Sequence, residues 1–292
     1  MKRHYFRWLL CASLALLVVA ASIPAGFADD QDLLQFLAKA SANRWSNIRS
    51  GKGTVYVSEW RIKDGKPVTS ELTLKGAFLD ERFRLCESLS DTDKPLLEMS
   101  FDGARLVVWH KDGQVSPPVR IKEGRVDSLA GRFDAYFDIR ARDIAKWSRV
   151  GVAKIVGREK LSDGQCVIIQ REDSSTTAGG QNVVELLKFW LNTDKDYTVP
   201  KMEITVTMDG RTVLHRTVTN EVKQYPNGLW ACSKATSVQY DADGNKTKEQ
   251  IVTYSPDFEI NVPVTKDDLE IKLPPETQVF DEILSMEYIT SS

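Results

Sequence analysis

Apolar and polar residues alternate along much of the chain with a period of two, the pattern of strands covered on one face and wet on the other. The clearest run places Met202, Ile204, Val206 and Met208 on one face, with charged and hydroxyl residues on the other. Pro200 opens this run, where its missing N–H removes no ladder hydrogen bond. Asp-Gly pairs recur between such runs, at 64–65, 102–103, 112–113, 163–164, 209–210 and 243–244. The pattern therefore predicts a meander of antiparallel hairpins.

The expected strands cover most of the chain. Their ranges are Thr54–Ile62, Val68–Leu79, Glu81–Glu87, Leu96–Phe101, Ala104–His110, Val150–Arg158, Gln165–Arg171, Val183–Leu191, Leu229–Tyr240, Lys246–Tyr254 and Phe258–Val262. The first two exceed the usual strand length, which favours a wide, strongly curved sheet over a compact sandwich. The tract Asp173–Gly180 has the composition of a flexible loop, and the tail from Leu273 is expected to be mostly extended.

Helical spacing interrupts the alternation in two places. Residues Asp29–Arg49 are expected to form an amphipathic helix, capped by Asp29 or Asp30, and its only large packing partner is the sheet. Its apolar side carries Leu33, Leu37, Ala40, Trp45 and Ile48. Residues 126–136 and 139–147 are expected to be two short helices or irregular connections. In the first of these, or just after it, Phe133, Tyr136 and Phe137 are candidates for a lid over a cavity mouth, although the same aromatics could pin a loop to the core.

The first residues have the pattern of a secretory signal peptide. Lys2, Arg3 and Arg7 form a positive region, and the stretch Leu9–Ala21 is apolar. Gly26 and Ala28 supply small residues before a cleavage site that we place ahead of Asp29. Residues 1–28 are thus expected to be removed and residues 29–292 to form one exported, periplasmic domain. An uncleaved N-terminal anchor is the alternative.

Composition excludes several classes of function. The 292 residues contain 39 Lys and Arg against 41 Asp and Glu, and removal of the signal peptide makes the balance more acidic, which argues against a nucleic-acid partner. No later segment is apolar enough to span a membrane.

The remaining cysteines are Cys86, Cys166 and Cys232. No CxxC spacing occurs, at most one disulfide can form, and buried thiols are the expected state. No metal-ligand spacing, nucleophile elbow or phosphate loop is present, so we expect no metal, no cofactor and no catalysis.

The order of the elements resembles a known family. The motifs are Trp45–Gly53 at the helix end, Phe83-Arg84, Phe101-Asp102-Gly103, Phe189–Asn192, Pro200–Ile204, Asp257–Asn261 and Leu273–Asp281. In this order they look like the LolA/LolB-like periplasmic lipoprotein carriers, a broad group that includes the RseB-type sensors. The resemblance covers nearly all of the mature chain. It implies a strongly curved antiparallel half-barrel whose concave face is covered by the N-terminal helix and short helices, with room for acyl chains between them.

Four aromatic residues are candidates for lining such a cavity: Tyr56, Trp60, Phe78 and Trp190. Trp60 shares a face with Tyr56, and the opposite face of the same strand is apolar as well. A strand covered on both faces can pack on one side and line a pocket on the other. The alternative is that these aromatics only fill the core between the sheet and the helix.

The sequence therefore predicts a mainly β, exported protein that binds an apolar ligand without catalysis, such as a lipid or the acyl chain of a lipoprotein, with outer-membrane lipoprotein sorting as one role. An envelope sensor or interaction protein of the same fold, with a transient envelope-protein partner, is the first alternative. A secreted hydrolase with a carboxylate pair is the second.

Overall fold

The structure is a computed structural model that describes residues 30–91, 94–124 and 153–291. Helix α1 (Asp30–Ser46) leads into one sheet of 16 strands. The first half of the chain supplies β1 (Ser50–Lys63), β2 (Lys66–Leu79), β3 (Arg82–Leu89), β4 (Pro95–Phe101), β5 (Arg105–His110) and β6 (Val119–Glu123). The second half supplies β7 (Ala153–Leu161), β8 (Gly164–Thr176), β9 (Asn182–Asn192), β10 (Thr198–Met208), β11 (Arg211–Gln224), β12 (Trp230–Tyr240) and β13 (Lys246–Tyr254). The last elements are β14 (Glu259–Ile260), α4 (Lys266–Leu269), β15 (Gln278–Asp281) and β16 (Met286–Ile289).

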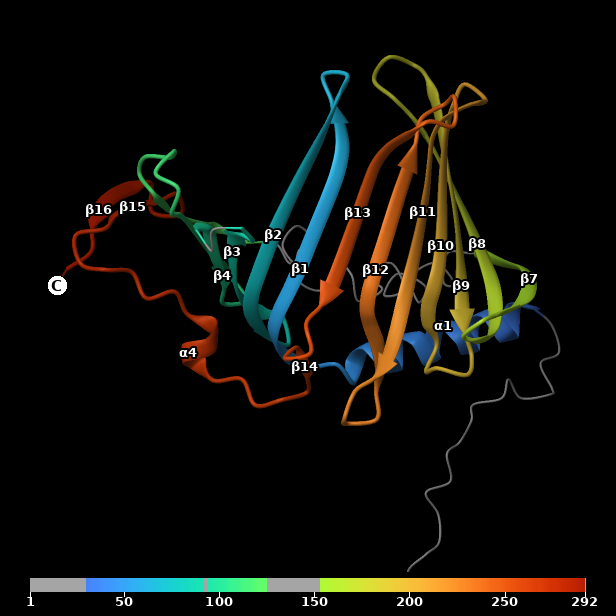
Figure 1. Ribbon diagram of the computed structural model, residues 1–292, viewed down its shortest axis with the longest axis horizontal. Coiled ribbons are helices and arrows are strands. Elements are labelled where there is room, and N and C mark those ends of the chain that lie inside the picture. The colour runs from blue at the N-terminus through green and yellow to red at the C-terminus, as the bar shows by residue number, and fades with distance from the viewer. Residues whose placement is uncertain (1–29, 92–93, 125–152, 292) are drawn as a thin grey trace, which may run out of the picture.

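The sheet consists of two antiparallel meanders joined in its middle. Neighbouring strands follow the order β16-β15-β6-β5-β4-β3-β2-β1-β13-β12-β11-β10-β9-β8-β7, with β14 pairing β1 to one side (Figure 1). The join is the long-range β1–β13 pair, in which Val55 lies opposite Tyr254. The contact between β15 and β6 is parallel. The predicted Asp-Gly turns are confirmed, because the glycine of each pair has a positive φ.

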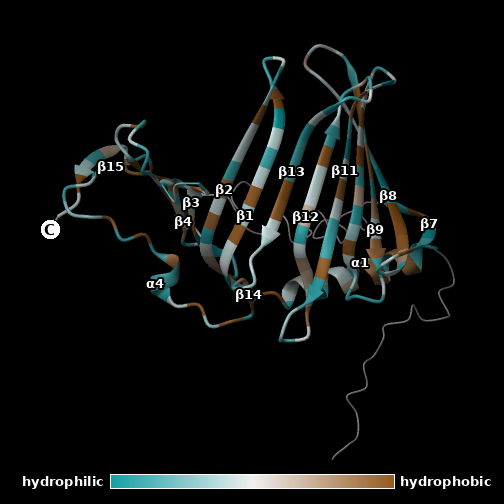
Figure 2. Cartoon of the chain, in the orientation of Figure 1, coloured by the Kyte–Doolittle hydropathy of each residue, from teal (hydrophilic) through white to brown (hydrophobic). Residues whose placement is uncertain are grey.

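The two faces of the sheet differ in cover. We call the face against which α1 packs the inner face and the opposite one the outer face. Leu33, Leu34 and Leu37 of α1 are buried against inner-face residues of β8 to β10, and Figure 2 shows hydrophobic colouring on β8 and β9 beside the helix. This helix cluster also contains Val167, Ile169, Leu187, Phe189, Leu191 and Ile204. Since Met202 and Val206 pack against it as well, the predicted face of β10 is confirmed for these residues.

A second apolar cluster, the central cluster, occupies the inner face of the other half of the sheet. Val55 and Val57 of β1 lie in register with Tyr254 and Val252 of β13, so all four point to one side. The cluster continues through Leu74, Phe83, Leu85, Met99, Phe101 and Leu106 on β2 to β5. One face of the sheet is thus apolar in both halves, whereas α1 packs against the β7–β10 half.

The expected strong curvature is wrong. The sheet is open, with β16 and β7 at its opposite ends, and it is not strongly curled (Figure 1). The unusual length of β1 and β2 predicts curvature, but in the structure it produces a long hairpin instead. Each has 14 residues, whereas β3 has 8, and the surplus extends beyond β3 as a hairpin.

Other local expectations need correction or fall outside the described residues. Asp173–Thr176, expected in a loop, continues β8, because each residue there pairs with β9. Strand β6, helix α4 and the β15–β16 hairpin were not expected as such. The lid candidates Phe133, Tyr136 and Phe137, and the two short helices proposed around them, lie outside the described residues.

Candidate functional site

The structure does not bring the four predicted ligand-binding aromatics together. Tyr56 and Trp60 alternate with Val55 and Val57 on β1 and therefore lie on the outer face. Trp190 is also an outer-face residue, opposite Lys201 of β10 and Ile168 of β8. Only Phe78 points to the inner face, where it pairs with Phe83 and Gly51.

Lysine side chains cover two of the outer-face aromatics. The ammonium of Lys201 lies 4.1 Å from the ring centre of Trp190, and that of Lys246 lies 4.7 Å from the ring centre of Trp60. Trp190 is only 5% exposed, and its indole N–H donates to Oε2 of Glu159 over 2.6 Å. Cation–π contact and a hydrogen-bonded indole therefore account for the position of Trp190 without a ligand, and Trp60 shares the cation–π contact. Tyr56, by contrast, is 48% exposed.

Phe78 belongs to a half-buried margin of the central cluster. We define this inner margin as Leu72, Phe78, Leu97 and Val108, which are partly exposed while the residues that they contact are buried. They lie on β2, β4 and β5, on either side of the buried Leu85 of β3. Apolar side chains with one side packed and the other accessible are what a hydrophobic ligand requires.

The inner face changes character toward the hairpin end of β1 and β13. Glu59, two residues after Val57 on β1, forms an ion pair with Lys248 at 2.7 Å and lies 3.5 Å from Arg61. Gln250 also donates to Glu59. The face is therefore apolar at the α1 end and charged at the other, a gradient that matches an amphipathic molecule.

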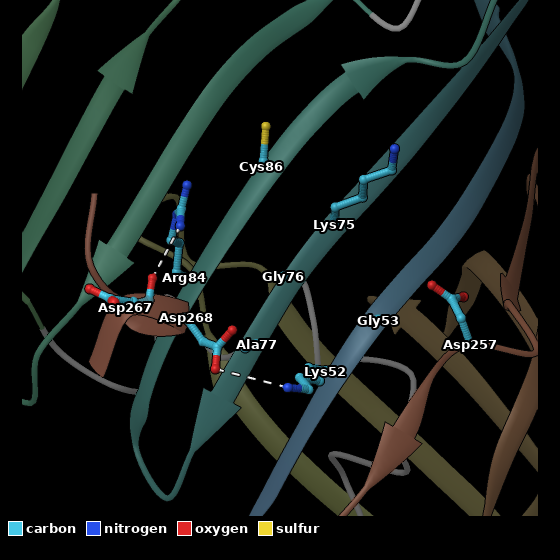
Figure 3. Close-up of a pocket in the computed structure, with 10 residues that line it drawn as sticks. All are labelled: Lys52, Gly53, Lys75, Gly76, Ala77, Arg84, Cys86, Asp257, Asp267 and Asp268. Atoms are coloured by element: carbon cyan, nitrogen blue, oxygen red, sulfur yellow. Dashed lines mark hydrogen bonds and ion pairs between the residues drawn. The ribbon is translucent and has the colours of Figure 1, made fainter. Parts of the chain in front are cut away.

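A hollow of about 470 Å³ lies on the outer face where α4 packs over β2 and β3. Its floor is made of small residues on two neighbouring strands, Gly53, Gly76 and Ala77 (Figure 3). Around it stand charged side chains of both signs: Lys52, Lys75, Arg84, Asp257, Asp267 and Asp268. Cys86 completes the lining.

Two acids of this hollow, Asp257 and Asp268, have a pKa below the usual value for a carboxyl group. Hydrogen bonds from the backbone and side chain of Thr265 lower the pKa of Asp268, with Lys52 at 4.0 Å (Figure 3). Burial acts to raise the pKa of Asp257, but hydrogen bonds from Ser255 and Thr54 outweigh it and the pKa is lowered. A general acid needs a raised pKa, so neither carboxyl is suited to the hydrolase alternative.

Nothing in the sequence marks the residues of this hollow as one site. Lys75, Arg84 and Cys86 occupy outer positions of β2 and β3, and their alternation with Leu74 and Leu85 was the available signal. Helix α4, which forms one wall, has only four residues and leaves little periodicity to detect. Among the described residues, no group of three or more His, Cys, Asp or Glu side chains is arranged to hold a metal ion.

Comparison with known proteins gives similar folds at low identity. No protein-family profile matches the chain, and no curated protein matches it. Similar solved structures include a DUF1329 family protein from Desulfovibrio piger, at 13% identity and a TM-score of 0.49, covering 83% of this chain and 98% of that one. A putative outer membrane lipoprotein-sorting protein domain from Vibrio parahaemolyticus also has 13% identity and a TM-score of 0.49, covering 81% and 97%. A LolA superfamily protein from Nitrosomonas europaea has 16% identity and a TM-score of 0.41, covering 80% and 97%.

These similar structures thus include a lipoprotein-sorting protein domain and a LolA superfamily protein. Likeness at this level assigns no function to this chain, so its function has to be inferred from its own residues. Within the described part of the chain, no helix has the length and apolar character needed to cross a membrane.

Proposed function

We propose that this protein binds an apolar ligand, such as a lipid or the acyl chain of a lipoprotein, without catalysing a reaction. The observation that carries the proposal is the inner margin: Leu72, Phe78, Leu97 and Val108 are partly exposed at the edge of a buried apolar cluster. The ligand chain would lie along this margin. A polar headgroup would then meet the charged end of the same face near Glu59 and Lys248.

The driving force is the removal of apolar surface from water. Burial of each methylene contributes about 0.8 kcal/mol, so a chain of several methylenes against the inner margin binds by several kcal/mol. Glu59, Lys248 and Arg61 already neutralise one another in part, which leaves polar hydrogen-bonding capacity for a headgroup without a strong preference for its charge.

The experiment is a titration with N-phenyl-1-naphthylamine, an apolar probe whose fluorescence rises on binding. The double variant Phe78→Ala/Leu97→Ala removes two margin side chains, and we expect its affinity for the probe to fall roughly tenfold. The matched control is Tyr56→Ala/Trp60→Ala, which removes two outer-face aromatics and is expected to bind the probe like the parent. Thermal melts of all three chains separate loss of the site from loss of the fold.

Two results would overturn the proposal. One is a parent protein that does not bind the probe. The other is a folded inner-margin variant that binds unchanged while the Tyr56→Ala/Trp60→Ala control loses affinity, which would move the ligand to the outer face. A second route to the same question is native mass spectrometry of protein purified gently from its source, in which a carried lipid appears as added mass.

We further propose that the chain works outside the cytoplasm, in the periplasm, after removal of residues 1–28. Support comes from the positive, apolar and small-residue order of that segment. Amino-terminal sequencing of the exported protein tests it, and a mature chain that does not begin at Asp29 would contradict the proposed cleavage.

A second candidate function is an envelope interaction protein, and one surface favours it. The β15–β16 hairpin exposes Ile283, Leu284, Met286, Tyr288 and Ile289 at one end of the sheet. Large exposed apolar groups on an end strand are typical of protein-binding surfaces. Co-purification of a membrane partner, lost in a Leu284→Ser/Ile289→Ser variant and without lipid in the isolated protein, would favour this function over ligand carriage.

A further inference from the structure

The β1–β2 hairpin extends well beyond its neighbour β3. Pairing of β2 with β3 begins at Leu72, and pairing of β1 with β13 stops at Arg61. Between them, every residue from 61 to 70 is exposed. At a rise of about 3.3 Å per residue, the β2 arm extends roughly 20 Å beyond its β3 neighbour. Figure 1 shows the hairpin as a finger whose tip is free of its neighbours.

This finger combines exposed apolar groups with positive charge. Ile62 is 42% exposed and Val68 39%. Arg61 is paired with Val68 and Lys63 with Lys66, so Ile62 and Val68 lie on opposite faces of the hairpin. Asp64 is the only acid among residues 61–68. The chain as a whole has a net charge of −2, so this concentration of cations is local.

The β15–β16 hairpin provides a comparison within the same molecule. It exposes Ile283 to 40% and Leu284 to 64%, which is comparable to or greater than the exposure of Val68 and Ile62 in the finger. Its acids are Asp281, Glu282 and Glu287, with no Lys or Arg between residues 278 and 289. Glu282 lies 3.9 Å from Arg120 of β6. The molecule thus has two exposed apolar hairpins of opposite charge.

We infer that the β1–β2 finger docks on a membrane surface that carries anionic lipids. Cations near such a surface are attracted to the negative headgroups, while small apolar side chains enter the interfacial region. The acidic β15–β16 hairpin is repelled by the same surface, so the charge pattern also orients the molecule with the finger toward the lipid.

The docking does not require the proposed ligand, but the two fit together. The charged end of the inner face, with Glu59 and Lys248, lies at the base of the finger. A finger on the membrane therefore brings the proposed headgroup end of the binding face near the lipid surface from which an amphipathic ligand comes.

The experiment is co-sedimentation of the purified exported protein with vesicles made of equal parts phosphatidylglycerol and phosphatidylcholine, and with vesicles of phosphatidylcholine alone. We expect binding to the anionic vesicles that weakens as salt is raised, because surface charges are screened over about 10 Å at 0.1 M salt. Lys63→Glu/Lys66→Glu is expected to weaken it by more than about tenfold. Ile62→Ser/Val68→Ser is expected to weaken vesicle binding less than the charge reversal does. The loss of affinity should depend little on salt concentration.

The matched control is Ile283→Ser/Leu284→Ser, which removes comparable apolar surface from the acidic hairpin and should leave vesicle binding unchanged. All of these positions are exposed, so the variants are expected to melt like the parent and to bind N-phenyl-1-naphthylamine like the parent. Failure of vesicle binding with intact probe binding overturns the docking alone, and the reverse result overturns the proposed ligand alone.

The inference is wrong if the parent does not bind the anionic vesicles, if it binds both kinds of vesicle equally, or if the finger variants bind as the parent does. A pull-down with the same variants distinguishes a finger that instead binds an acidic protein. In that case the parent would bind a protein partner but no vesicles, and Lys63→Glu/Lys66→Glu would lose the partner. This result would also reject docking on a membrane.

Discussion

Arg84 on β3 donates from Nε to Oε1 of Glu98 on β4 over 2.6 Å, and the Glu98 side chain is only 3% exposed. Lys111 places its ammonium 2.5 Å from the other oxygen of the same carboxylate. One buried anion therefore holds two cations on the outer face of the sheet.

Glu98→Ala should destabilise the fold, because it leaves Arg84 and Lys111 without their shared partner. Both cations are partly exposed and water compensates some of the loss, so we expect a decrease of about 2 kcal/mol in the free energy of unfolding, measured in urea. Arg49→Gln is the control. It breaks an ion pair with Asp80 that is open to solvent and should leave the urea midpoint unchanged. An equal midpoint for parent and Glu98→Ala would show that the buried carboxylate is not a stabilising centre.

Gly76→Ala should be strongly destabilising, because a Cβ at this position would overlap the carbonyl oxygen of Arg84 on the neighbouring strand. Since that obstacle is backbone, the strands have to separate, and we expect a loss of about 2–3 kcal/mol. Gly157→Ala is the matched substitution on β7. Its Cβ would meet only Cδ1 of Ile168, at 3.6 Å, and the change should be neutral or slightly stabilising. Thermal melts of the two variants test the contrast, and similar melting temperatures would contradict it.

The three cysteines of the described chain are not joined in disulfides, and their thiols should react at different rates. Cys86 is half-buried, whereas Cys166 and Cys232 are buried. Burial, helped by the charges of Asp194, Glu159 and Asp163, raises the pKa of Cys166 from 9.0 to about 11, so little thiolate is present near neutral pH. In the folded protein, iodoacetamide should therefore modify Cys86 first, and Cys86→Ser should remove the fast phase. Peptide mass spectrometry would refute the order if Cys166 were modified as quickly.

The same shift has a pH consequence for stability. A raised pKa means that the folded chain holds the Cys166 proton more tightly than the unfolded chain does. This contribution is fully present below pH 9.0 and is lost as the pH rises through about 11. Cys166→Ala should therefore lose less stability than the parent between pH 8 and pH 11, as followed by urea unfolding. An identical decline in both chains would assign the alkaline loss to other groups.

Thr265→Ala should loosen α4 without unfolding the sheet. The Thr265 hydroxyl accepts from the backbone N–H of Asp268, whose carboxylate accepts from the backbone N–H of Thr265 in return. Loss of such a cap costs about 1 kcal/mol, enough to open a helix of four residues that is held by Leu269. Faster amide exchange confined to residues 265–270 is the expected result. Unchanged exchange there would show that packing of Leu269 alone holds α4.

Local features of the fold could be predicted because they depend on neighbouring residues. Gly65 and Gly210 adopt the positive φ that an Asp-Gly turn requires, and Met202 and Ile204 lie on the face that their spacing indicates. The β1–β13 and β15–β6 pairs could not be predicted, because nothing near Val55 specifies Tyr254 as its partner. The curvature of the sheet could not be predicted for the same reason. The length of a strand does not reveal whether the neighbouring strand pairs with it over its whole length.

The candidate site was predicted less well than the fold. Val57 and Trp60 are both apolar, so the sequence alone does not tell which face of β1 receives cover. Which face of β1 is covered follows from the position of α1 and from the lysine over Trp60. Both depend on contacts between distant segments. Phe78 remains in the proposed site because it faces the central cluster.

The β1–β13 pair also constrains how the molecule can be made. Strand β1 is among the first segments of the described chain to leave the ribosome, whereas its partner β13 leaves much later. Until β13 arrives, one edge of β1 has unpaired backbone groups in the centre of the future sheet, where a foreign strand could attach. Biogenesis of this protein is therefore expected to be slow and dependent on a holding chaperone, and a chain truncated before Lys246 should aggregate instead of folding partway.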